Sequence, residues 1–219
     1  MRFADGRSVR KASQQVPDGD NLVVAQGRDY VSRGAFKLLG AVEAFHPQIA
    51  GKVCLDLGAS TGGFTEVLLE QGAKRVYAVD VGTGQLHERL RNDVRVVSLE
   101  QTDARHLTNA LVPEPIGFLT GDLSFISLKK VIPCVVPFLA EECEAVLLIK
   151  PQFEVGKGAI GSGGIVRDAE VRRQCVEDVV RFCVEQFHWR LRGQCESPIC
   201  GGDGNQEYLA YFQSGRESE

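Results

Sequence analysis

Four charged side chains occupy positions that a folded sheet would bring to one edge. Lys150 directly follows the apolar run 145–149, and Asp122 follows a shorter one. Glu207 opens the last predicted strand, and Lys37 lies ahead of a glycine-rich loop. Two amines alternating with two carboxylates hold one another in place, which lowers the cost of burying them. Such a group can take a proton from a hydroxyl. The alternative is that the four residues form two purely structural salt bridges at the sheet edge.

The glycine-rich loop is the expected seat of a cofactor. Residues 53–56 form an apolar run that ends on Asp56, small residues follow, and helical spacing resumes at Glu66. Glycines in a turn from strand to helix let a ligand approach the backbone closely, at the carboxyl ends of the strands. A simple structural turn would have the same composition.

The glycine spacing favours one cofactor. A dinucleotide-binding loop reads G-x-G-x-x-G, whereas this loop reads G-x-x-x-G-G. Asp56 would oppose a phosphate but suits a sulfonium cation or its amino acid tail, so S-adenosyl-L-methionine is favoured over NAD. Asp80 is expected on the ribose diol, and Asp103 either receives the adenine amino group or caps a helix. The predicted cofactor-binding residues are Asp56, Gly58, Ser60, Thr61, Gly62, Gly63, Phe64, Asp80, Asp103 and Asp122.

A methyl donor at this loop gives the four charged residues a definite reaction. Methyl transfer to a sugar hydroxyl requires that oxygen to be aligned with the methyl group and to lose its proton. Desolvation and the neighbouring Lys37 favour a neutral Lys150, which would take the proton while Asp122 and Glu207 orient it. Lys37 would position the hydroxyl and stabilise the developing oxyanion.

Alternating strands and helices must position these residues. The hydrophobic periodicity predicts strands at 53–56, 75–80, 94–99, 116–119 and 145–149, and helices at 31–45, 66–70, 85–91, 127–139 and 168–187. Ser32, Ser127 and Asp168 are the expected N-caps. Strands at 189–195 and 207–212, separated by a glycine-rich turn, predict a closing antiparallel hairpin. The fold class is therefore α/β, a mostly parallel seven-stranded, doubly wound sheet with helices on both faces.

Three stretches fall outside these elements. Residues 152–166 contain five glycines, which is too flexible for a regular element and too long for a plain connection. A mobile lid or substrate loop is expected there. Residues 1–28 have few large apolar positions and predict only short strands around 3–4 and 21–24. Residues 215–219 are expected to fray.

Composition narrows the function classes. The 219 residues suffice for one substantial core. No apolar segment is long enough to span a bilayer and the amino terminus has no signal core, so a cytoplasmic protein without membrane contact is expected. The seven cysteines include no C-x-x-C pair and the four histidines are scattered, so no metal site is expected.

The net charge is -4, yet residues 1–37 carry seven Arg or Lys against four Asp. A polyanion contact would therefore lie on the amino-terminal side.

Four stretches stand out along the chain: residues 30–38 (YVSRGAFKL), 56–65 (DLGASTGGFT), 121–128 (GDLSFISL) and 148–154 (LIKPQFE). In the same order, they resemble those of the TlyA (hemolysin A) family of FtsJ-like ribosomal RNA 2'-O-methyltransferases. The resemblance covers roughly residues 30–213. It implies a Rossmann-like methyltransferase fold and methylation of a cytidine ribose in 16S or 23S ribosomal RNA. It also implies a Lys-Asp-Lys-Glu catalytic tetrad, which falls on Lys37, Asp122, Lys150 and Glu207.

This sequence differs from the family's pattern at the amino terminus. Members of the family usually begin with an S4-type RNA-binding domain, and residues 5–13 resemble only the end of one. We therefore expect a remnant of that module with a linker at 1–28 and a methyltransferase domain at 29–214. Reduced affinity for ribosomal RNA or ribosomal subunits would follow, because phosphate contacts supply much of the binding.

Two other functions are considered for this sequence. A membrane-active haemolysin, suggested by the family's older name, lacks the expected spanning or cationic amphipathic helix. A non-catalytic RNA-binding or ribosome-assembly relative would have no need of the complete tetrad.

Overall fold

The computed structural model describes residues 2–3, 22–23 and 29–215. The chain divides into two compact units, Met1–Tyr30 and Val31–Glu219. In the first unit, β1 (Arg2–Phe3) pairs antiparallel with β2 (Leu22–Val23), close to the two short strands expected there. Most of the expected RNA-binding remnant at 1–28, and most of the expected tail, lie outside the described residues.

The second unit is built on a seven-stranded sheet with the order β5-β4-β3-β6-β7-β9-β8. The first five strands in this order are parallel, and β9 runs antiparallel to both of its neighbours, which confirms the mostly parallel sheet and the closing hairpin. The strands are β3 (Val53–Leu57), β4 (Arg75–Val79), β5 (Val96–Leu99), β6 (Ile116–Gly121), β7 (Leu139–Ile149), β8 (Arg190–Glu196) and β9 (Tyr208–Gln213).

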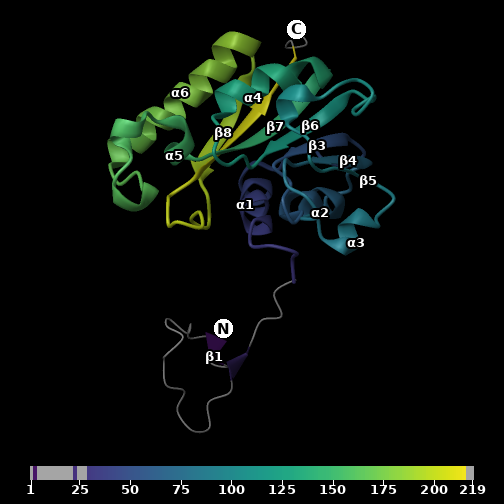
Figure 1. Cartoon of the computed structure of the whole chain (residues 1–219), viewed down its shortest axis with the longest axis horizontal. Helices are drawn as coiled ribbons and strands as arrows, with labels where there is room; N and C mark the ends of the chain where they lie inside the picture. Colours follow the sequence, from purple (N-terminus) through teal and green to yellow (C-terminus); the bar gives the residue numbers. More distant parts are fainter. Residues whose placement is uncertain (1, 4–21, 24–28, 216–219) are drawn as a thin grey trace. The chain divides into compact units, whose positions relative to one another are not determined.

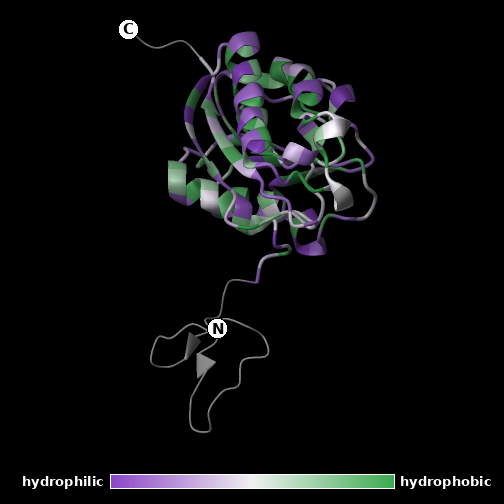
Figure 2. Ribbon diagram, turned by 90° about the vertical axis from the view of Figure 1, so that its left-hand side faces the viewer, coloured by the Kyte–Doolittle hydropathy of each residue, from purple (hydrophilic) through white to green (hydrophobic). Residues whose placement is uncertain are grey.

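Helices cover both faces of the sheet. Figure 1 shows α1 and α2 on one face and α4 and α6 on the other. Hydrophobic and hydrophilic residues alternate along these helices (Figure 2), as expected where one side packs on a sheet and the other meets water. The α-helices are α1 (Ala35–Phe45), α2 (Gly63–Glu70), α3 (Glu88–Arg91), α4 (Leu128–Val135), α5 (Pro151–Glu154) and α6 (Ala169–Phe187), and the 3-10 turns are η1 (Ala104–His106), η2 (Val136–Phe138), η3 (Lys157–Ala159) and η4 (Ser162–Gly164).

The core forms where α4 and α6 meet the sheet. Ile132, Val179 and Phe212 are fully buried there, in one cluster with residues of all the central strands. Burying a side chain of this size contributes roughly 1.5–3 kcal/mol. This packing fixes the strands, and therefore the edge at which their carboxyl ends lie.

Several predicted boundaries were wrong for identifiable reasons. Ser32 does not cap α1, which begins at Ala35 after Gly34. The helix expected over 127–139 ends at Val135, because Pro137 has no N–H to continue it and a 3-10 turn follows. Strand β7 then begins at Leu139 rather than 145, since exposed glutamates interrupt its apolar pattern. The expected caps Ser127 and Asp168 are confirmed, each accepting a backbone hydrogen bond.

The glycine-rich segment is more ordered than expected. Its first residues form helix α5, and two 3-10 turns follow. Its end is held by the buried Asn205, whose amide donates to the Gly164 carbonyl at 3.0 Å and accepts from the Val166 N–H at 3.0 Å. The prediction that no regular element occurs in 152–166 was therefore wrong for 152–154.

The strand order reverses between β3 and β6, and Gly58 lies at this switch point. Its φ is +78°, and a Cβ there would lie 2.5 Å from the Asp122 carbonyl oxygen. The Asp122 N–H in turn donates to the Leu57 carbonyl at 2.9 Å. Glycine at 58 is thus what allows the loop after β3 and the segment after β6 to touch.

Gly58→Ala should lower the free energy of unfolding by roughly 2–4 kcal/mol, from left-handed strain plus overpacking. Gly84→Ala is the matched control, because φ there is +63° but nothing lies within 4 Å of the added Cβ. Its cost should be about 1–2 kcal/mol. Urea denaturation of both variants measures the difference, and equal losses would contradict the close approach at Gly58.

Candidate active site

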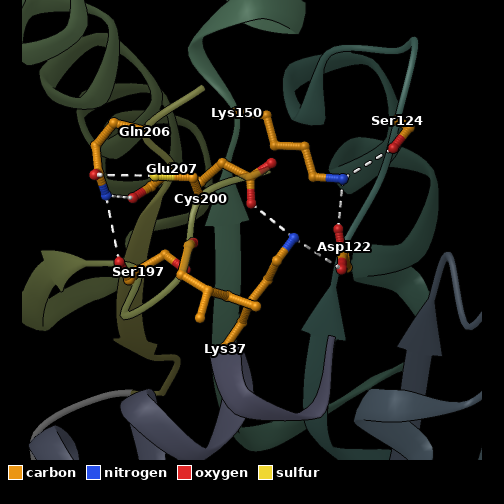
Figure 3. A network of polar contacts seen from close by, with 9 residues as sticks. Lys37, Asp122, Ser124, Lys150, Ser197, Cys200, Gln206 and Glu207 are labelled. Carbon is orange, nitrogen blue, oxygen red and sulfur yellow. Dashed lines mark hydrogen bonds and ion pairs between the residues drawn. The ribbon is translucent and has the colours of Figure 1, made fainter. Parts of the chain in front are cut away.

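The four predicted tetrad residues meet at the carboxyl edge of the sheet (Figure 3). Lys37 comes from α1, Asp122 follows β6, Lys150 follows β7 and Glu207 immediately precedes β9. The Lys150 amine lies 2.5 Å from Asp122 Oδ1, and the Lys37 amine lies 3.8 Å from Asp122 Oδ2. The Glu207 carboxylate lies 2.7 Å from the Lys37 amine. Asp122 therefore bridges two amines.

The tetrad is largely withdrawn from water. Lys37 and Lys150 are each 8% exposed and Glu207 is 2% exposed. A buried charge is costly unless it is paired and hydrogen-bonded. The Lys150 amine also lies 2.9 Å from the Ser124 hydroxyl oxygen, so it is held from two sides by one segment.

The loop before β9 fixes Glu207. The Ser197 N–H donates to the Glu207 carbonyl at 2.8 Å, and the Gln206 side chain donates to both the Ser197 and Glu207 carbonyls (Figure 3). A Cβ on Gly201 would lie 2.5 Å from Glu207 Oε1, so the backbone approaches the carboxylate closely. The sequence predicted that Glu207 orients Lys150, but the structure pairs Glu207 with Lys37.

Next to the tetrad lies a cavity of about 470 Å³. Of the predicted cofactor-binding residues, those that line it are Gly58, Ser60, Asp80, Asp103 and Asp122. A smaller cavity of about 200 Å³ adjoins it and is lined by Thr61, Gly63 and Phe64, together with Gly58, Ser60 and Asp122. Gly62 instead caps α2 and faces Leu90.

Two acids on the larger cavity are held by nearby hydrogen bonds. Asp80 accepts from the Ser60 N–H at 2.8 Å and from the Gly82 N–H at 2.7 Å. Asp103 caps η1, and the Arg105 guanidinium beside it lowers the pKa of that carboxyl to about 2. The expected capping role of Asp103 is therefore confirmed, and Asp103 also lines the larger cavity.

Asp56 lies where the sequence did not place it. Its carboxylate is fully buried beneath the loop and accepts hydrogen bonds from Thr65 Oγ1 at 2.7 Å and Thr120 Oγ1 at 3.0 Å. Burial raises the pKa of Asp56 to about 6, against the lowering effect of the two threonines. Asp56 supports the loop from below, which corrects the expected direct contact with a cofactor.

The Asp56 pKa predicts a pH-dependent stability. Because the folded-state pKa of Asp56 lies above the unfolded value of 3.8, its contribution to stability is fully present below pH 3.8 and is lost as pH rises through about 6. The difference between the folded and unfolded pKa of Asp56 corresponds to roughly 3 kcal/mol of folding free energy. Asp56→Asn should remove this contribution, so the stability of the variant relative to wild type should rise between pH 4 and pH 7. Urea denaturation at both pH values measures it, and a constant difference would contradict it.

Three residues at the site were not found from the sequence. The Glu100 carboxylate accepts from the backbone N–H groups of Gly84, Gln85 and Leu86 at 2.6–2.9 Å, and Gln85 lines the larger cavity. Phe125 has a φ of +64° and is 90% exposed at the cavity rim. Ser124 contacts Lys150. The positive φ has no sequence signal, because phenylalanine rarely adopts it.

A doubly wound sheet with a cavity at its switch point and a closing antiparallel hairpin is the arrangement of the Rossmann-like methyltransferase fold. The N-methyltransferase NodS from Bradyrhizobium japonicum, solved with S-adenosyl-l-homocysteine, has this fold (TM-score 0.58, 19% identity, 86% of this chain and 90% of that one). The FtsJ-like methyltransferase model matches residues 30–214. The chain therefore belongs to the FtsJ-like methyltransferase family.

Closer relatives agree with this family. The chain is 47% identical to the 16S/23S rRNA (cytidine-2'-O)-methyltransferase TlyA of Mycobacterium tuberculosis, over 96% of this chain and 79% of that protein. It is 41% identical to Hemolysin A of Brachyspira hyodysenteriae, over 96% and 88% of the two chains. The crystal structure of a hemolysin candidate from Lactococcus lactis superimposes with a TM-score of 0.81 and 44% identity, covering 85% of this chain and 89% of that one.

Two further properties concern the described residues alone. None of their helices combines the length and apolar composition needed to cross a bilayer. Within the same part of the chain, no three His, Cys, Asp or Glu side chains are arranged to hold a metal ion.

Proposed function

We propose that this protein is an S-adenosyl-L-methionine-dependent methyltransferase that acts on the ribose 2'-hydroxyl of a cytidine in 16S or 23S ribosomal RNA. The observation that carries the proposal is the buried tetrad beside the cavity at the sheet edge. Family membership and the printed functions of the TlyA relatives support the same reaction and substrate. Such a substrate would place the enzyme in the cytoplasm.

The residues around the larger cavity fit the proposed cofactor. Asp80 offers a carboxylate to a ribose diol, and Asp103 offers one to an adenine amino group. Gly58 lines the cavity, and its lack of a Cβ lets the loop lie against the Asp122 carbonyl. Asp122, which lines both cavities, lies where a sulfonium cation would find a negative partner. When bound, S-adenosyl-L-methionine supplies an electrophilic methyl group at this edge.

Each tetrad residue has a distinct task in the proposed reaction. Lys150, once neutral, accepts the proton of the attacking 2'-hydroxyl as the general base. Asp122 and Ser124 fix the Lys150 amine, at 2.5 Å and 2.9 Å. Glu207 fixes Lys37, which donates a hydrogen bond to the hydroxyl oxygen and stabilises its developing negative charge.

Lys150→Met should lower the rate of methyl transfer by roughly 10²–10⁴-fold, the usual contribution of a general base. Cofactor affinity should change little, because Lys150 is not among the residues lining the larger cavity. Lys74→Met is the control, since this exposed lysine lies beside Glu114, away from the tetrad. Single-turnover assays with labelled cofactor and titration calorimetry give the two readouts, and full activity of Lys150→Met would refute the role.

The proposed substrate is tested by locating the methylated nucleotide in ribosomal RNA. Purified protein, labelled cofactor and ribosomal subunits that lack the modification should yield 2'-O-methylcytidine at a defined position, located by nuclease digestion and mass spectrometry. Methylation confined to a base, or labelling of protein alone, would contradict the proposed acceptor. Cofactor binding without any transfer would instead favour a non-catalytic relative.

A further inference from the structure

Glu154 ends the stretch LIKPQFE and is not one of the tetrad residues. It is the last residue of α5, four positions after Lys150. Its Oε2 accepts a hydrogen bond from the Ser127 hydroxyl at 2.6 Å, and its Oε1 accepts one from the Leu128 N–H at 2.6 Å. Both donors lie at the start of α4, far from Glu154 in sequence.

These bonds complete a set of links between two segments of the site. The acid segment, residues 122–128, carries Asp122, and the lysine segment, residues 150–154, begins with Lys150. At one end the Lys150 amine meets Asp122 and Ser124. In the middle the rings of Phe125 and Phe153 lie 5.0 Å apart between centroids. At the far end Glu154 bonds to Ser127 and Leu128, so the two segments are linked at both ends and between the two rings.

Helix α4 does not need Glu154 in order to begin. The Ser127 side chain already caps it by accepting from the Lys129 N–H at 3.2 Å. What Glu154 adds is a connection from this helix start to the end of β7. The acid segment has a residue with positive φ, Phe125, and such strain persists only where the surroundings fix the backbone on both sides.

The surroundings of Glu154 make the link strong. Burial raises the pKa of this carboxyl, while the bonds from Ser127 and Leu128 act in the opposite direction. Removing the acceptor would leave the buried Leu128 N–H without a partner, which costs free energy. The contacts are therefore expensive to break.

We propose that Glu154 is a positioning residue that holds the acid segment against the lysine segment, so that Asp122 and Ser124 keep the Lys150 amine in its reactive place. The inference rests on the proposed function of Lys150, and it adds to the tetrad a fifth group that acts through the backbone of the acid segment. Glu154 itself touches neither substrate nor cofactor in this scheme.

Glu154→Ala removes both hydrogen bonds to the start of α4 and should lower kcat for methyl transfer roughly tenfold. The KM for cofactor should stay within about twofold, since Glu154 does not line the larger cavity. Glu154→Gln keeps one acceptor oxygen and should fall between wild type and the alanine variant. Asp178→Ala is the control: Asp178 borders the same cavity of about 290 Å³ as Glu154, but its hydrogen bonds go to Gln174 and Arg181 of its own helix.

Hydrogen exchange read by mass spectrometry separates positioning from general loss of stability. Amides in 122–128 should exchange roughly tenfold faster in Glu154→Ala, whereas those in 53–65 should be unchanged. Wild-type kcat, or equal acceleration in both segments, overturns the proposal. If the alanine variant does not fold, the glutamine variant decides, and unfolding of both would also overturn it. The exchange measurement uses no substrate, so it still tests Glu154 if Lys150→Met should prove active and the proposed function fail.

Discussion

The ion pairs of Asp122 with two lysines are the interaction on which the site depends. One carboxylate between two amines is a stable arrangement only when the strands beneath it are fixed, because the charges are largely removed from water. Asp122 is fixed by β6 and Lys150 by β7, which are neighbours in the sheet, and Lys37 reaches them from α1. Glu207 then supplies the fourth charge from the strand inserted antiparallel beside β7. The unusual position of β9 thus places a carboxylate next to Lys37.

The glycine-rich loop after β3 and the tetrad residue Asp122 are in direct contact. The loop after β3 touches the segment after β6 through Gly58 and the Asp122 carbonyl. Asp56 supports the same place from below, bonded to threonines of α2 and β6. A displacement of the loop would therefore displace Asp122 directly, because the two are in contact. This explains why the sequence shows its strongest signals at the ends of β3, β6 and β7, where the chain leaves the core and the two functions meet.

The sequence predicted those strand ends because a buried strand leaves an apolar run, and a charge that follows it is conspicuous. It predicted less where a side chain acts on a distant backbone. Glu100 binds three N–H groups 14 to 16 residues away, and Glu154 binds a helix start 26 residues away, contacts that leave no periodic trace. The sequence also did not predict the direction of the Asp56 side chain. Its spacing from the glycines identified the loop, but spacing does not reveal whether a side chain points toward the cavity or into the core.

Charge balance connects the proposed cofactor with the proposed base. As the structure stands, two lysines and two carboxylates balance one another. A neutral Lys150 would leave the group with a net negative charge in surroundings that solvate it poorly, and a positive charge at the same edge compensates for that loss. A sulfonium is such a charge, whereas a pyrophosphate would add to the imbalance. The charge balance of the tetrad is therefore better matched by the proposed cationic methyl donor than by a pyrophosphate, an argument that does not depend on the loop spacing.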